Sequence, residues 1–157
     1  MKKLVIVACL LASMSFSAVA INPAAPFVLA YTTEKGVNVS VRADLDIKNY
    51  DGGSVEILLY TQIDNPEKPY ITWKLNHFYY ALDPHGTGKP ISVLYRVDRV
   101  TNFSRNSDYV ISGSVQPTPI VPIIEGSDEY KTAVYAYNFA VQSGKMAEAQ
   151  AKYKSKK

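Results

Sequence analysis

Strict alternation of apolar and polar residues over positions 37–47 is the feature that most limits what this chain can fold into. Every odd position in this stretch is apolar and every even position is polar or charged. Successive side chains of a strand point to opposite faces, whereas a helix would place Arg42 and Asp44 on the same side as the valines. The pattern therefore predicts a β-strand with one buried face and one wet face.

Other segments rich in β-forming residues follow at short intervals, separated by clusters of Gly, Asn, Asp and Pro. They predict strands over residues 27–33, 54–63, 70–82, 91–100 and 108–116. Three prolines between residues 117 and 122 predict an extended segment without ladder hydrogen bonds, because proline has no N–H to donate.

Residues 130–141 carry two competing periods. Apolar side chains recur at helical spacing through Tyr130, Ala133 and Tyr137, and Ser127 precedes them as a candidate helix cap. The odd positions from Ala133 to Val141 are also all apolar, and the segment is rich in β-forming residues. We favour a strand here, with a helix as the alternative, and expect a short helix or a frayed tail after Gly144.

Together these segments predict an all-β protein, an immunoglobulin-like β-sandwich of about seven strands. The alternative is an α+β domain with a C-terminal helix on an antiparallel sheet. The expected organisation is a cleaved segment over residues 1–20, one domain over residues 21–144 and a lysine-rich C-terminal tail over residues 145–157.

The first twenty residues have the form of a secretory signal peptide. Lys2 and Lys3 precede an apolar stretch, and Ala18-Val19-Ala20 matches the small-x-small pattern before a cleavage site. A lipoprotein site ending at Cys9 is the weaker alternative, because only a short apolar stretch would precede it. Serines interrupt the stretch before it could span a membrane. We therefore expect export to the periplasm or cell surface of a Gram-negative bacterium, with no transmembrane segment after cleavage.

Cleavage after residue 20 would remove the only cysteine, so the mature domain would contain no disulfide or catalytic thiol. The formal charge would fall from +3 to +1 with the loss of Lys2 and Lys3. A nearly neutral domain gives no electrostatic reason to expect a nucleic-acid partner.

Motifs for catalysis or for metal and cofactor binding are missing from the sequence. His77 and His85 are the only two histidines, too few for a zinc site without thiolates. The carboxylates near Asp44 lack the spacing of a calcium loop. No nucleophile elbow, phosphate loop or dinucleotide fingerprint is present. We therefore expect no enzyme activity, no catalytic residues, no metal and no cofactor.

Binding is the remaining possibility, and two features bear on it. Twelve tyrosines are spread along the chain, and Tyr70, Phe78 and Tyr80 would share one face of their strand as a wet aromatic surface. His85 lies in a loop, residues 83–90, that is rich in glycine and proline. These four residues are the candidate binding residues.

The function expected from these observations is protein–protein contact by an exported protein, as a surface or fimbria-type subunit or an adhesive module. The predicted architecture is similar to that of chaperone–usher pilus subunits, whose extended N-terminal segment adds a strand to a neighbour. By that resemblance, residues 21–30 would be the donated segment and a homo-oligomer would form. The lysine-rich end departs from that family, whose subunits finish in a strand. The alternative function is a soluble periplasmic accessory or inhibitor protein that binds one envelope partner.

Overall fold

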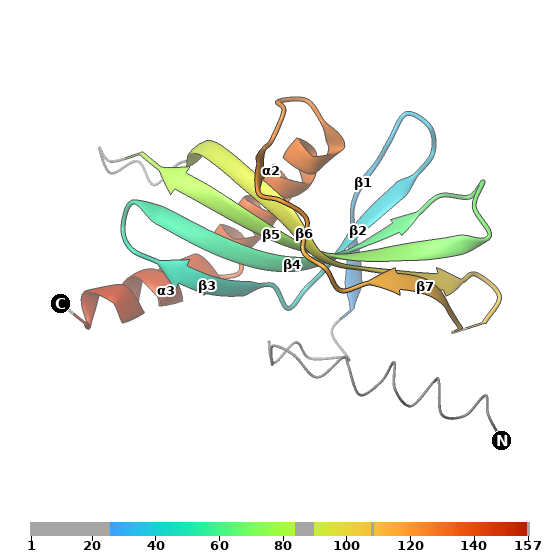
Figure 1. The fold of residues 1–157 in the computed structure, drawn as a ribbon. Coiled ribbons are helices and arrows are strands. Elements are labelled where there is room, and N and C mark those ends of the chain that lie inside the picture. Colours follow the sequence, from blue (N-terminus) through green and yellow to red (C-terminus); the bar gives the residue numbers. More distant parts are fainter. Residues whose placement is uncertain (1–25, 84–89, 108, 157) are drawn as a thin grey trace, which may run out of the picture.

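A computed structural model describes residues 26–83, 90–107 and 109–156 of the chain. In this part, eight strands form one antiparallel sheet, and two helices follow them at the C-terminal end (Figure 1). The strands are β1 (Phe27–Thr32), β2 (Asn38–Arg42), β3 (Asp46–Tyr50), β4 (Ser54–Asp64), β5 (Tyr70–Leu82), β6 (Pro90–Ser104), β7 (Val110–Ser114) and β8 (Val121–Pro122). The helices are α2 (Asp128–Gln142) and α3 (Lys145–Lys154).

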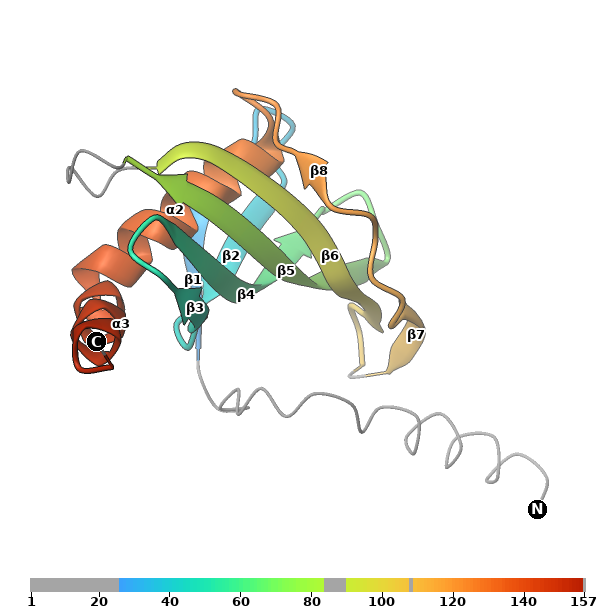
Figure 2. The ribbon, with the colours of Figure 1, turned by 60° about the vertical axis from the view of Figure 1, so that its left-hand side comes forward.

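The sheet is a meander in which the spatial order is β1-β2-β4-β5-β6-β7. The predicted strand at residues 37–47 is divided into β2 and β3, which pair with opposite ends of β4. At the other side, β7 and β8 lie along the outer edge of β6, as Figure 2 shows. The long central strands β4, β5 and β6 therefore carry the core, and short strands border them.

One face of the sheet is covered by α2, and the core lies between them. Alternate residues of β4 and β5 point toward the helix, where Phe78 and Tyr80 are each 1% exposed. The helix meets them with alanines, since Ala133, Ala136 and Ala140 have no exposed surface. These small side chains let the helix approach the large rings of β5 closely.

The sequence of α2 fixes where the helix begins and ends. The hydroxyl of Ser127 accepts a hydrogen bond from the Tyr130 backbone N–H at 3.1 Å, and acidic Asp128 and Glu129 occupy the first turn. Both features favour a helix N-terminus. Gly144, with a φ of +81°, separates α2 from α3 in a conformation that glycine adopts without strain.

The strand preferred for residues 130–141 is wrong, and the helical alternative is correct. The buried residues of this segment recur at helical spacing: Thr132, Ala133, Ala136, Tyr137 and Ala140. Helix α3 contacts β3 and α2, and its Met146 is buried, so most of the predicted tail is a packed helix.

The coarse class, a mostly antiparallel β-sheet with C-terminal helices, is as expected. An immunoglobulin-like sandwich is not confirmed, because all the described strands belong to one sheet and a helix covers it. The expected signal peptide lies outside the described residues. Neither described helix combines the length and apolar character that crossing a bilayer requires.

The Ser127 cap provides a test of the helix. Replacement of Ser127 by Ala removes the acceptor for the Tyr130 N–H and should lower the free energy of unfolding by about 1 kcal/mol. Urea denaturation followed by circular dichroism measures this change. Ser92→Ala, at an exposed position of β6, is the control and should change stability by less than about 0.5 kcal/mol. Equal effects of the two substitutions would contradict the assignment of the cap.

Candidate functional site

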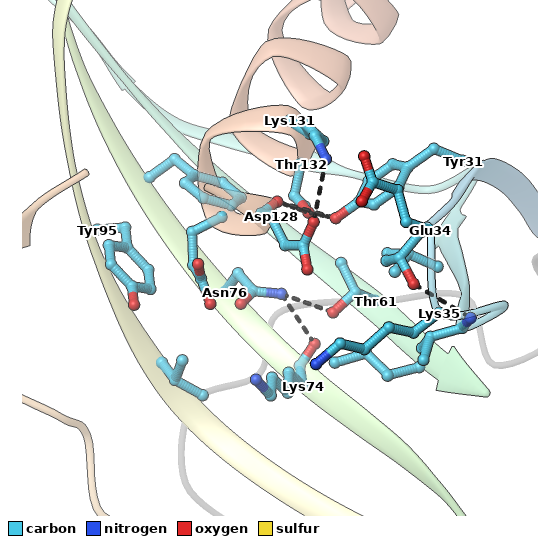
Figure 3. Close-up of a pocket in the computed structure, with 17 residues that line it drawn as sticks. Tyr31, Glu34, Lys35, Thr61, Lys74, Asn76, Tyr95, Asp128, Lys131 and Thr132 are labelled. Atoms are coloured by element: carbon cyan, nitrogen blue, oxygen red, sulfur yellow. Dashed lines mark hydrogen bonds and ion pairs between the residues drawn. The ribbon is translucent and has the colours of Figure 1, made fainter. Parts of the chain in front are cut away.

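A pocket of about 510 Å³ lies between the first turn of α2, the β1–β2 hairpin and the uncovered end of the sheet (Figure 3). It forms because α2 begins above the middle of the long strands, and the sheet continues past the helix. Strands β2, β4, β5 and β6 supply the floor, which includes Val39, Ile63, Phe78 and Val97. The floor is therefore largely apolar, with a few polar side chains among the apolar ones.

The polar centre of the floor is the pair Asn76 and Thr61, both buried. Asn76 Nδ2 donates to Thr61 Oγ1 at 2.9 Å and to the Lys74 backbone carbonyl at 3.3 Å. A carbonyl oxygen can only accept, so this contact fixes which end of the Asn76 amide carries the nitrogen. No residue in the described part of the chain donates a hydrogen bond to the other end, the Asn76 Oδ1.

Tyr31 holds the helix against the hairpin side of the pocket. Its hydroxyl donates to the Asp128 backbone carbonyl at 2.8 Å and lies 2.9 Å from Thr132 Oγ1. Burial, and secondarily the nearby acidic residues of α2, raises the pKa of Tyr31 above its usual value, so the phenol stays protonated and available as a donor. This contact keeps the start of α2, and with it one wall of the pocket, in place.

The pocket is lined by three lysines and three carboxylates. Lys131 and Asp128 pair with each other at 3.3 Å. Within the described residues, Lys35 and Lys74 make no ion pair, and neither does Glu129. In Figure 3, Lys35 and Lys74 lie at the bottom of the pocket, whereas Asp128 and Lys131 lie at the top. The lining is therefore electrically balanced, with unpaired charge of both signs.

The opposite face of the sheet carries a second polar cluster around His77. Its Nε2 lies 3.1 Å from Glu56 Oε2, and its Nδ1 lies 3.0 Å from the Tyr79 hydroxyl and 3.5 Å from Asp98 Oδ2. Asp98 also pairs with Arg96 Nε at 2.6 Å. A neutral imidazole that donates from Nε2 and accepts at Nδ1 satisfies both hydrogen bonds.

The environment of His77 favours that neutral form. Burial lowers the pKa of His77 from its usual value, an effect that Asp98 and Glu56 oppose only in part. Burial also raises the pKa of Tyr79, which keeps this phenol protonated and makes it a poor nucleophile. Among the residues described, no group of three or more His, Cys, Asp and Glu side chains is placed to hold a metal ion. We interpret the His77 cluster as structural.

A third feature is the edge segment, residues 109–124, which contains β7 and β8 and has no charged residue. Every residue of it except Ile123 is exposed, and Tyr109, Ile111 and Ile124 are 77%, 54% and 78% exposed. β7 pairs with β6, and no other described strand pairs with β7. An apolar, uncharged sheet edge is a template for another chain.

The four candidate binding residues do not form one site. Phe78 and Tyr80 are buried beneath α2, so the expected wet aromatic surface is wrong for both residues, because the helix covers the face that they share. Phe78 still contributes to the pocket floor, and Tyr80 OH donates to the Ala133 carbonyl at 2.8 Å. Tyr70 is half-buried at the start of β5, and His85 lies outside the described residues.

The sequence interpretation missed the pocket and the edge segment. The pocket could not be found from local patterns, because five strands, the turn between β1 and β2, and helix α2 bring its lining together only in the folded chain. The edge segment did leave a signal, sixteen consecutive residues without charge in a chain that is 20% charged. The prolines within the segment obscure that signal, because they also indicate breaks between strands.

Comparisons with protein-family models, with curated proteins and with solved structures each found no match to this chain. Function must therefore be inferred from the pocket, the His77 cluster and the edge segment themselves.

The His77 cluster predicts a pH dependence of stability. In the unfolded chain the pKa of His77 returns to about 6.5, above its value in the folded protein, so the unfolded state binds the proton more readily. Stability should therefore fall as the pH decreases through about 6.5 toward the lower pKa of the folded state. Urea midpoints measured at about pH 7.5 and about pH 5.5 should show the loss.

His77→Gln should reduce this pH-dependent loss, and His85→Ala, which changes the only other histidine, should retain it. An identical pH dependence in wild type and His77→Gln would show that His77 does not carry the effect.

Proposed function

We propose that this protein is exported and acts by binding another protein, without catalysing a reaction. The observation that carries the proposal is the edge segment, which presents exposed aliphatic and tyrosine side chains along one border of the sheet. Soluble proteins usually protect such borders with charges or prolines. Prolines stand at positions 117, 119 and 122, but β7 contains neither a proline nor a charge.

The occupant that fits β7 is an extended, apolar and uncharged segment of a partner protein, added to the sheet as a further strand. Its backbone would pair with the outer edge of β7, and its side chains would cover Val110 and Ile111. The prolines beyond β7 remove N–H donors, so the ladder would be confined to the region of Val110–Ser114.

The pairing of β1 bears on the choice between a polymer subunit and an accessory protein. A subunit of the chaperone–usher type would donate residues 21–30 to a neighbour, yet residues from Phe27 onward pair with β2 of the same chain. Donation would require this pairing to open. We therefore favour a periplasmic accessory or inhibitor protein over a fimbria-type subunit.

Ile111→Lys provides the test, because it places a charge on the exposed edge of β7. In the native host, a photo-crosslinking residue at position 111 should capture one envelope protein, and the linked peptide should lie in an extended apolar segment of that partner. The Ile111→Lys substitution should weaken the isolated complex by about tenfold or more, since a lysine at a binding edge must be desolvated.

Val141→Lys is the matched control, because Val141 is an apolar residue of similar exposure, 49%, on α2. It should leave the complex intact. The other candidate occupant of the edge is a second copy of this chain, and light scattering of the purified protein, which measures its oligomeric state, tests for it. A dimer that Ile111→Lys abolishes would assign the edge to a second copy and contradict the accessory role. Retention of the partner by Ile111→Lys would contradict the edge segment as the contact.

A further inference from the structure

The pocket at the start of α2 is separate from the β7 edge, and its chemistry points to a ligand of its own. We propose that it binds a short peptide with a free amino end and a free carboxyl end. This inference does not depend on the proposed protein partner. Three features of the pocket support it: the amide on the floor, the unpaired charges on the walls and the size of the space.

Asn76 is the most specific element of the pocket. Its side chain is 6% exposed, and the oxygen of its amide accepts no hydrogen bond from any residue that the structure describes. The oxygen is accessible from the pocket, so a ligand that supplies a donor can form a hydrogen bond with it. Thr61 Oγ1 accepts from Asn76, which leaves its own hydroxyl proton for an acceptor. A peptide unit offers both groups, an N–H for Asn76 and a carbonyl for Thr61.

Lysines on the sheet side supply the contact for the carboxyl end. Lys74 lies on β5 two residues before Asn76, and Lys35 projects from the β1–β2 hairpin. Neither ammonium group forms an ion pair with a described residue. A carboxylate placed between them would be paired by two cations in a partly buried site, where charged hydrogen bonds are stronger than in water.

Acidic residues on the helix side supply the contact for the amino end. Glu129 in the first turn of α2 has no ion-pair partner among the described side chains. Tyr95 of β6 lines the same pocket, and burial raises its pKa, with the negative charge of Glu129 as the second cause. An ammonium group there would be paired by Glu129 and would have Tyr95 beside it.

The balance of charge selects against simpler ligands. The lining contains as many carboxylates as lysines, so an anion without a cationic group would be repelled by one wall and a cation by the other. The helix N-terminus is not open to an anion, because Ser127 caps it and Asp128 and Glu129 occupy its first turn. A zwitterion can place its carboxylate near the lysines of one wall and its ammonium group near the carboxylates of the other.

The dimensions agree with two or three amino acids. A volume of about 510 Å³ lies in the range of small-molecule sites. Three extended residues separate the terminal charges by about 10 Å, which allows them to contact opposite walls. Val39, Ile63 and Phe78 on the floor would pack against small apolar side chains.

The probe we would use is tri-alanine with free ends, titrated into the isotopically labelled mature protein and followed by nuclear magnetic resonance. We expect a dissociation constant of about 1 mM or tighter and a shift of the Asn76 side-chain amide resonance. Tri-alanine that is acetylated and amidated should bind about tenfold more weakly or worse, because both terminal charges are removed. Acetate and inorganic phosphate should likewise bind more weakly than tri-alanine.

Lys74→Met removes one contact for the carboxylate and should weaken tri-alanine binding by about tenfold. Lys68→Met, at an exposed position in the β4–β5 turn, is the matched control and should bind like wild type. The lysine variants carry the test, because a substitution of Asn76 would also remove its buried hydrogen bond to Thr61 and so destabilise the fold. The proposal is overturned if tri-alanine does not bind, if the blocked peptide or acetate binds as tightly, or if Lys74→Met and Lys68→Met behave alike.

Discussion

The close contact between the alanines of α2 and the large rings of β5 is the interaction on which the rest of the structure depends. Ala133, Ala136 and Ala140 lie directly on the sheet, and the Tyr80 hydroxyl ties the helix backbone to it at Ala133. The ring centroids of Tyr80 and Tyr137 are 5.3 Å apart, so the same tyrosine also packs against the next turn. A larger residue on this stripe would hold the helix away from the sheet and open the core.

The pocket follows from a difference in length between the helix and the strands that it covers. The fifteen residues of α2 span about 22 Å, whereas the thirteen residues of β5 span about 44 Å. The helix can therefore bury only part of the strand, and the alanine contact fixes which part. Past the start of α2 at Asp128, the sheet continues without a helix over it. There the residues that face the pocket change from large aromatic rings to Asn76, Thr61 and Lys74. This change in residue type separates a packed core from a solvent-accessible site.

The sequence predicted the strands well because their signal is local. The alternation at residues 37–47 depends only on which side chains face the core, and the structure has strands β2 and β3 there. The local sequence did not determine whether residues 130–141 form a strand or a helix, because their tyrosines and valines fit a strand pattern as well as a helical one. Packing decided it, since the helix brings Ala133, Ala136 and Ala140 into the core that contains Phe78 and Tyr80. Because the helix covers this face of the sheet, Phe78 and Tyr80 lie in the core and do not form the exposed aromatic surface that was expected.

Strand β6 links the two proposed sites. Tyr95 and Val97 line the pocket from one side of this strand. At its outer edge the same two residues hold the edge segment, since Tyr95 pairs with Val121 and the Val97 backbone N–H donates to Thr118 Oγ1 at 2.9 Å. A ligand that moves the floor would therefore act on backbone groups that position the edge segment. Any such coupling must be reciprocal, because a partner that fixes the edge would change the affinity of the pocket by the same factor.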